Sequence, residues 1–202
     1  MKIAYVIEDF SIRGGAERII SEKANYLATK FHHEVTIISV YQDKRPMSYA
    51  LEKGVNLVSL NIPFTPRTHS ALKTLVNRTI TLLKVWKSFQ KVINQLKPDI
   101  IFYTMSLGAL LLPLCKTKAK KVYESHSARC FTPYHQLFSF MERKADLIVC
   151  LTQGDAQEYK HARKVTVIPN FITYPKSTAR HYEVKKAIAV GRLEYPKGFD
   201  LL

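Results

Sequence analysis

The sequence predicts an α/β fold, a doubly wound parallel sheet of the Rossmann-like type. Short runs rich in valine and isoleucine alternate with longer stretches of helical periodicity. Several of the short runs are apolar on both faces, as expected for strands that helices cover from both sides. Hydrophobic residues make up 47% of the 202 residues, which is enough for a sizeable core. Such a β-α alternation is typical of a parallel sheet.

The individual elements can be placed in order along the chain. Strands are predicted at the apolar runs 3–7, 35–40, 55–60, 99–103, 121–123, 146–151 and 165–168. Helices are predicted where apolar residues recur at helical spacing, at 15–30, 70–96, 105–117, 133–144 and 153–161. Each helix connects one strand to the next, as parallel pairing requires.

The pattern changes near residue 170. Residues 1–172 are interpreted as one complete domain. Residues 173–186 are polar and without periodicity, and are interpreted as a linker. Residues 187–202 begin again as a strand, a tight turn and the start of a helix, which we interpret as the first element of a second, truncated domain.

Composition limits the class of partner. The formal net charge is +15, from 31 basic and 16 acidic residues, which favours a nucleotide, a membrane surface or nucleic acid. Three scattered cysteines are interpreted as buried thiols in a reducing compartment and predict neither a disulfide nor a zinc site. We expect a cytoplasmic protein, because no run of about 18 apolar residues and no secretion signal is apparent.

A pair of glycines, Gly14 and Gly15, separates the first predicted strand from its helix in "SIRGGAERII". In a parallel sheet this place lies at the carboxyl ends of the strands, where ligands bind. Free backbone amides at a helix start suit phosphates and sugar hydroxyls. A plain tight turn is the alternative. The dinucleotide fingerprint G-x-G-x-x-G is absent, which disfavours a nicotinamide dehydrogenase.

Two further stretches carry candidate site residues. His126, in "VYESHSAR", follows the fifth predicted strand and therefore lies at the same edge of the sheet. The alternative is an ordinary surface histidine. Arg192 and Lys197, in "AVGRLEYPKG", flank the turn before the last predicted helix, where two cations could hold a diphosphate. The alternative is two charges on a solvated loop.

Together, these stretches resemble family 4 glycosyltransferases of the two-domain GT-B fold. The similarity covers the whole chain and depends on the order of "GGAER", the histidine after strand five, "VIPNFI" and "VGRLEYPKG". It implies that Gly14 and Gly15 approach the donor diphosphate and the acceptor, that His126 contacts the donor sugar, and that Arg192 and Lys197 hold the diphosphate leaving group. It also implies a nucleotide-sugar donor and a glycan or lipid-linked acceptor in surface polysaccharide or glycolipid assembly.

The resemblance further implies retention of anomeric configuration without a metal or another cofactor. The sequence has no D-x-D stretch, a common metal-binding pattern of glycosyltransferases. The acidic E-x7-E motif of the family would lie beyond Leu202, so this chain is expected to be inactive alone. A GT-B-fold sugar-nucleotide 2-epimerase and a non-catalytic membrane-docking or binding module are the alternatives. No convincing pair of carboxylates supports the epimerase.

The predicted helix at 70–96 lies in a strongly basic part of the chain. No acidic residue occurs between Lys53 and Pro98. One broad helical face is predicted to be apolar, with Leu75, Leu82, Leu83, Trp86, Phe89, Ile93 and Leu96; Lys73, Lys84, Lys87 and Lys91 lie opposite. The simpler interpretation is a core-packed helix with solvated lysines. The alternative is peripheral docking on an anionic membrane. Nucleic acid is disfavoured because exposed aromatic residues do not alternate with the lysines.

Overall fold

A computed structural model of the protein describes residues 1–41, 45–64, 69–171, 189–191 and 198–199. Residues Met1–Asn170 form one compact unit. Its centre is a seven-stranded sheet with the order β3-β2-β1-β4-β5-β6-β7, in which all neighbours are parallel. The strands are β1 (Lys2–Ile7), β2 (Glu34–Ser39), β3 (Val55–Ser59), β4 (Ile100–Thr104), β5 (Lys120–Glu124), β6 (Leu147–Cys150) and β7 (Val165–Val167). All seven predicted strands are confirmed.

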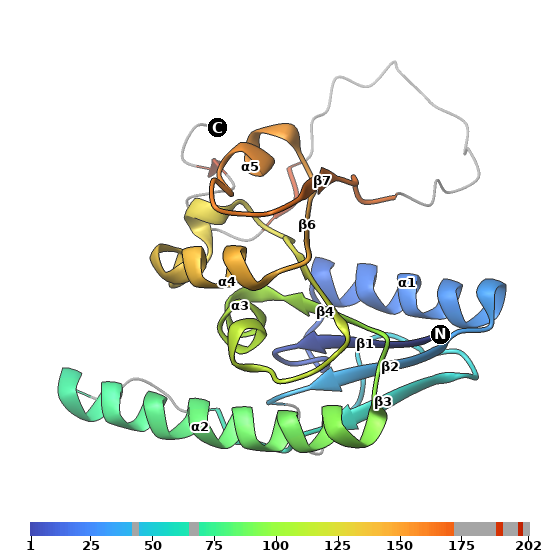
Figure 1. Ribbon diagram of the computed structural model, residues 1–202, viewed down its shortest axis with the longest axis horizontal. Helices are drawn as coiled ribbons and strands as arrows, with labels where there is room; N and C mark the ends of the chain where they lie inside the picture. Colours follow the sequence, from blue (N-terminus) through green and yellow to red (C-terminus); the bar gives the residue numbers. More distant parts are fainter. Residues whose placement is uncertain (42–44, 65–68, 172–188, 192–197, 200–202) are drawn as a thin grey trace. The chain divides into compact units, whose positions relative to one another are not determined.

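Five helices connect the described strands (Figure 1). They are α1 (Gly15–Phe31), α2 (Ala71–Leu96), α3 (Met105–Leu114), α4 (Phe138–Lys144) and α5 (Gln153–Gln157), and two short 3-10 turns, Arg129–Phe131 and His135–Leu137, precede α4. The predicted helix 133–144 begins later, because Tyr134 has a left-handed backbone with φ 62°. The predicted helix 105–117 ends early, at Leu114, and Cys115 is extended. The predicted helix 153–161 is only one turn and a half.

The sheet has a helical layer on each face. Side chains such as Val6, Ile38 and Tyr103 point to one face and pack with α2 and α3. Their neighbours Tyr5 and Ile37 point to the other face and pack against α1. This alternation follows from the two-residue period of a strand. The predicted doubly wound parallel sheet is therefore confirmed.

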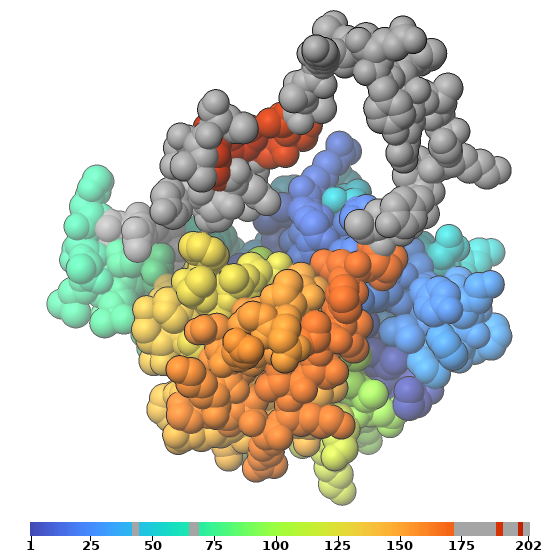
Figure 2. Space-filling model, turned by 90° about the horizontal axis from the view of Figure 1, so that it is seen from above, coloured from blue at the N-terminus to red at the C-terminus, as the bar shows by residue number. Residues whose placement is uncertain are grey.

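Helix α2 packs against the sheet only through its second half. Its buried side chains are Val85, Phe89 and Ile93, with Trp86 among the half-buried ones. Leu75 and Leu83 are 63% and 51% exposed. The predicted apolar face is therefore wrong at these two leucines. Leu75 lies in the first turns of the helix, which the sheet does not reach, and Leu83 points about 200° away from the buried Val85. Figures 1 and 2 show that these turns protrude from the rest of the unit.

Residues Phe171–Leu202 form a second unit, of which only Phe171, 189–191 and 198–199 are described. The domain end at 172, the linker 173–186 and the truncated domain 187–202 fall mainly outside the described residues, and they stay predictions. Within the described ranges, none of the helices has the length and apolar character that a bilayer crossing requires.

Candidate functional site

The candidate site lies at the carboxyl edge of the sheet. Because all strands are parallel, the loops that follow β1, β4 and β5 leave the sheet at this edge. The register aligns Val6 with Tyr103, and Thr104 with Glu124. Gly14 and Gly15 follow β1, and His126 follows β5, with only β4 between these two strands. The structure thus places these three predicted residues at one edge.

Gly14 is the N-cap of α1, and a neighbouring side chain of the protein itself favours glycine at this position. Its backbone is extended, with φ −124° and ψ 168°. A Cβ atom at this position would collide with Oε2 of Glu17, which folds back over the cap. Glu17 is third in the helix, the position from which a carboxylate reaches back to the cap in a capping box. The close approach predicted at Gly14 is therefore partly that of Glu17.

Gly15 has different surroundings. A Cβ atom here would meet no atom within 4 Å, so space is open beside its backbone. The loop before it is held by Asp9, whose Oδ1 accepts a hydrogen bond from the Ser11 amide (3.0 Å) and whose Oδ2 accepts one from Nη2 of Arg45 (2.7 Å). The Tyr49 hydroxyl donates to the Gly14 carbonyl at 3.0 Å. The glycine turn is therefore a fixed feature with free space at its second glycine.

Several carboxyl groups gather around this turn. Glu17 is 7% exposed, and its burial raises its pKa above the ordinary value. Asp9 and Glu8 act in the same direction through their negative charge. Glu8 itself accepts hydrogen bonds from the Ser106 hydroxyl (3.0 Å) and the Leu107 amide (3.1 Å) at the start of α3. Glu8 thus ties the loop after β1 to the first turn of α3, which directly follows β4.

His126 belongs to a buried cluster of charges. Its side chain is 3% exposed and that of Glu124 is 2% exposed. Nε2 of His126 lies 3.9 Å from Oε1 of Glu124. The same oxygen accepts a hydrogen bond from Nζ of Lys23 on α1. An imidazole, a carboxylate and an ammonium group therefore connect α1 to the end of β5.

This cluster retains unused hydrogen-bonding capacity. Among the described residues, neither ring nitrogen of His126 has a hydrogen-bond partner, and the same holds for Oε2 of Glu124. Buried polar atoms without partners are rare in folded proteins and require an explanation. Burial lowers the pKa of His126 and outweighs the opposing effect of Glu124, while Lys23 lowers it further. The ring is therefore neutral near pH 7 and has one donor and one acceptor.

The loop after His126 is anchored by two acidic residues. The carboxylate of Asp155 accepts hydrogen bonds from the Arg129 amide (2.8 Å) and the Ser125 hydroxyl (2.8 Å). The Arg129 guanidinium donates to Oε1 of Glu142 at 2.9 Å. Glu142 is fully buried, and its other oxygen accepts from the His161 amide at 2.8 Å. These contacts hold the backbone around residue 126 in place.

The surface hollows of the described residues lie away from the glycine turn and His126. Arg192 and Lys197 are outside the described residues. One surface hollow of about 410 Å³ lies on α2 beside Trp86, and another of about 260 Å³ lies between Tyr41 and Phe64. Neither is lined by the glycine turn or by His126. In the described part of the chain, no group of three or more His, Cys, Asp or Glu residues is arranged to hold a metal ion.

Sequence reasoning missed three site residues. Lys23, Glu124 and Glu17 were not predicted as site residues. Glu124 precedes His126 by two residues at the end of a strand, so alternation along the strand could have placed it on the α1 face. The spacing of Glu17 from Gly14 is that of a capping box. No sequence signal pairs Lys23 with Glu124, because they are 101 residues apart.

Comparison with known families identifies the family of this chain. Residues 13–174 match the family described as Glycosyltransferase Family 4. The chain belongs to this family. The resemblance predicted from the order of the motifs is thereby confirmed for the family 4 domain. No curated protein sequence matches the chain.

Solved structures show the same fold at low sequence identity. The family 4 domain is similar to sucrose-phosphate synthase from Thermosynechococcus elongatus, with a TM-score of 0.63 and 12% identity over 84% of this chain and 48% of that one. For the lipopolysaccharide outer core galactosyltransferase WaaB the TM-score is 0.64, with 16% identity over 86% and 46% of the two chains. For UDP-N-acetylglucosamine 2-epimerase from Rickettsia bellii the values are 0.50 and 12%, over 82% and 44%. The chain thus spans about half the length of each structure.

Proposed function

We propose that this family 4 domain is the acceptor-side part of an enzyme that transfers a sugar, of hexosyl type, from a nucleotide-sugar donor to a glycan or lipid-linked acceptor. Family membership supports the transfer reaction. The similar galactosyltransferase and sucrose-phosphate synthase support it through their fold alone. Because the epimerase shares the fold but the family match is to glycosyltransferases, transfer is favoured over epimerisation.

The observation that carries the proposal is the cluster around His126. The neutral imidazole is buried beside Glu124 and Lys23, has no hydrogen-bond partner among the residues that the structure describes, and lies at the edge where Gly15 leaves open space. A sugar hydroxyl would supply the donor and acceptor that the ring lacks once the side chain turns toward the ligand. Oε2 of Glu124 has the same unused capacity. The residues therefore suit a polyhydroxylated ligand.

In the proposed transfer reaction, His126 and the two predicted cations have different roles. Breaking a glycosyl–phosphate bond develops positive charge on the sugar and negative charge on the leaving phosphate. Arg192 and Lys197 would stabilise the phosphate charge, which is commonly a large contribution to catalysis. His126 would orient the sugar as a hydrogen-bonding partner. We propose retention of configuration, with neither a metal nor another cofactor required.

The acceptor and the location follow from charge and family. We propose a glycan or lipid-linked acceptor in surface polysaccharide or glycolipid assembly, on the cytoplasmic side of the membrane. A basic chain of net charge +15 favours anionic lipid and diphosphate ligands. Nucleic acid is not a proposed partner.

The test of the donor site is NMR on the chain with 15N-labelled histidines. We expect UDP-glucose, UDP-galactose, UDP-N-acetylglucosamine or GDP-mannose to shift the ring signals of His126 until saturation. His33, which precedes β2 at the opposite edge, is the internal control. If the His126 signals stay in place with every donor at millimolar concentration, the proposed donor contact is wrong.

A transfer assay on the enzyme of which this domain is the proposed acceptor-side part tests the reaction itself. With a donor that binds, His126→Ala should lower the rate by at least about a hundredfold, because a hydrogen bond made to the reacting sugar is lost. His33→Ala should leave the rate unchanged. Equal rates for the two variants would contradict the role of His126.

A further inference from the structure

The first half of α2 has an exposed apolar stripe that differs from its core face. The stripe consists of Leu72, Val76, Ile80 and Leu83, which recur at the i, i+4, i+8 and i+11 positions of one helical face. Their exposed fractions are 71%, 48%, 47% and 51%. Monomeric soluble proteins seldom expose contiguous apolar surface without a partner.

This stripe is not a continuation of the buried side of the helix. Val85 is fully buried and follows Leu83 by two residues, so the two side chains lie about 200° apart around the helix axis. No side chain before Val85 in α2 is buried. Packing against the core therefore accounts for the apolar residues on one face of the second half of the helix. It does not account for the apolar stripe on the first half.

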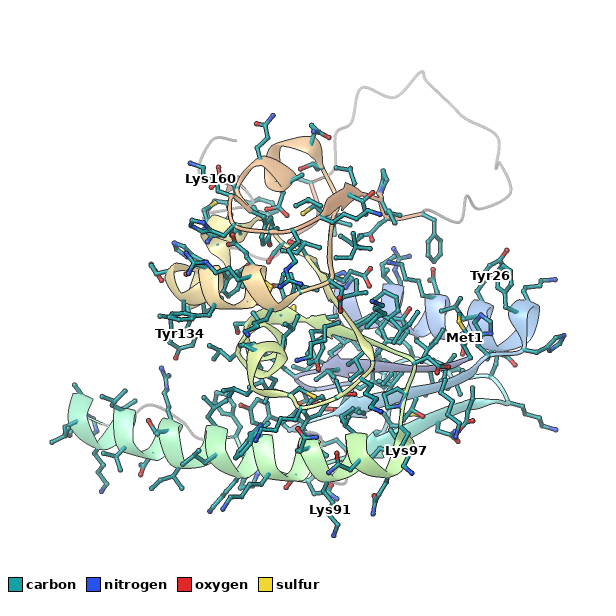
Figure 3. All side chains as sticks on the ribbon, in the orientation of Figure 1. Met1, Tyr26, Lys91, Lys97, Tyr134 and Lys160 are labelled. Carbon is teal, nitrogen blue, oxygen red and sulfur yellow. The ribbon has the colours of Figure 1, made fainter. Side chains whose placement is uncertain are left out.

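Cations border the stripe. Lys73 and Lys84 each follow a stripe leucine by one position, and Lys87 follows Leu83 by four. All three lysines are exposed, and no acidic residue occurs in α2. Lys91, on the same side of the helix, points away from the sheet in Figure 3. The helix thus combines an apolar strip with an adjacent row of positive charge.

The apolar stripe and the neighbouring lysines together indicate which kind of partner binds this surface. An anionic bilayer offers an apolar interior for the stripe and negative headgroups for the lysines. A second copy of the chain would bring two acid-free helices together, so that lysines would face lysines. A bound nucleic acid would contact the lysines but would leave the apolar stripe exposed to water. We infer that the first half of α2 docks in the plane of an anionic phospholipid membrane, with Leu72, Val76, Ile80 and Leu83 inserted at the interface.

On the opposite side of the helix from the stripe, a hydrogen bond connects α2 to the segment between β5 and α4. Nη1 of Arg78 donates to the Tyr134 hydroxyl at 2.6 Å. Tyr134 follows His126 by eight residues and points toward α2 in Figure 3. The neighbouring Phe131 and Phe140 are 60% and 65% exposed. The inference goes beyond the proposed transfer and does not depend on it.

Co-sedimentation with vesicles tests the inference without donor or acceptor. We expect the chain to pellet with phosphatidylcholine–phosphatidylglycerol vesicles and to bind pure phosphatidylcholine much more weakly. The combined variant Leu72→Gln, Val76→Gln and Leu83→Gln should lower the partition coefficient at least about tenfold, because it removes the inserted side chains. The variant Lys73→Gln, Lys84→Gln and Lys87→Gln should lose the preference for anionic lipid.

The matched control changes three apolar residues of similar exposure elsewhere, Tyr26→Gln, Phe31→Gln and Ile168→Gln, and should bind as the unchanged chain does. Circular dichroism and the urea midpoint verify that each variant is folded.

Equal binding to both vesicle types, or undiminished binding by the folded stripe variant, would overturn the inference. A dimer in sedimentation equilibrium that the stripe variant abolishes would assign the surface to a second copy and also overturn it. The histidine NMR titration, done without vesicles, tests the proposed function separately.

Discussion

Gly14 and Gly15 are adjacent in sequence but have different physical reasons to be glycine. At Gly14 the added methyl group of alanine would collide with the Glu17 carboxylate, whereas at Gly15 it would meet open space. Neither residue has a positive φ, so backbone strain explains neither. A contact within the protein explains why residue 14 is glycine. No such contact explains Gly15, so Gly15 is the better candidate for the place where a ligand approaches the backbone.

Gly15→Ala separates stability from binding. Because the position is helical and open, alanine should raise the free energy of unfolding by about 0.5 kcal/mol through a less flexible unfolded chain. Binding of the nucleotide sugar should become weaker, because the methyl group fills the space beside the turn. Urea unfolding and calorimetric titration measure the two effects. Unchanged affinity in the stabilised variant would show that no ligand uses this space.

Gly14→Ala is the companion change. It should destabilise the fold by about 1 kcal/mol in the unchanged chain, since the Glu17 side chain must leave the cap. In a Glu17→Ala background the same change should cost less, because only the preference of the N-cap for glycine over alanine remains. An undiminished cost without Glu17 would contradict this explanation of the glycine.

The buried His126 predicts a pH dependence of stability. Its pKa is lowered in the folded chain, so the unfolded chain, with an ordinary histidine pKa of about 6.5, binds more protons below that pH. The contribution of His126 to stability is therefore complete above about pH 6.5 and declines as the pH falls toward the lowered value. Urea unfolding as a function of pH should show this decline, and it should diminish in His126→Asn.

The neighbours of His126 should move its pKa in opposite directions. Lys23→Met should raise the pKa of His126, because it removes a nearby positive charge, and Glu124→Gln should lower it, because it removes a negative one. NMR titration of the His126 ring measures both, with His33 as the control. Shifts of the same sign in the two variants would exclude the cluster as described.

At the scale of elements, α2 has two halves with different roles. Phe89 is fully buried and contacts the ring of Tyr103 edge-on, with centroids 6.0 Å apart. Phe89→Ala should therefore cost about 3–5 kcal/mol of unfolding free energy. Leu72→Ala should change it by less than about 0.5 kcal/mol, because Leu72 is 71% exposed. Urea unfolding of the two variants checks this, and a large effect at Leu72 would show packing that the structure lacks.

The same helix shows why amphipathic patterns can mislead. Leu75 shares a helical face with residues that pack, and Leu83 lies on a different face, about 200° from Val85 around the axis. Helical periodicity alone cannot tell where the sheet ends. The late start of α4 has a similar cause. Residues 133–137 carry a helix-like composition, but the left-handed Tyr134 and the anchoring of the preceding loop by Asp155 delay the helix.

At the scale of the whole molecule, positive and negative charge are distributed unevenly. The net charge of +15 is strong for 202 residues, and part of it lies on α2, which has no acidic residue. The carboxyl edge, in contrast, collects Glu8, Asp9, Glu17 and Glu124 at the glycine turn and beside His126. A basic outer helix and a mixed, hydrogen-bonding edge suit a membrane surface and a sugar ligand, respectively.

The amino-acid sequence by itself determined the strand order along the chain, the parallel α/β class and the edge at which Gly14, Gly15 and His126 lie. These follow from local periodicity, because alternation and helical spacing report which faces are buried, and parallel strands share one carboxyl edge. Only the tertiary structure decided that Glu17 occupies the space over Gly14, that Lys23 and Glu124 enclose His126, and that the first half of α2 lies beyond the sheet. Each of these depends on where side chains meet in three dimensions, and periodicity carries no information about such contacts.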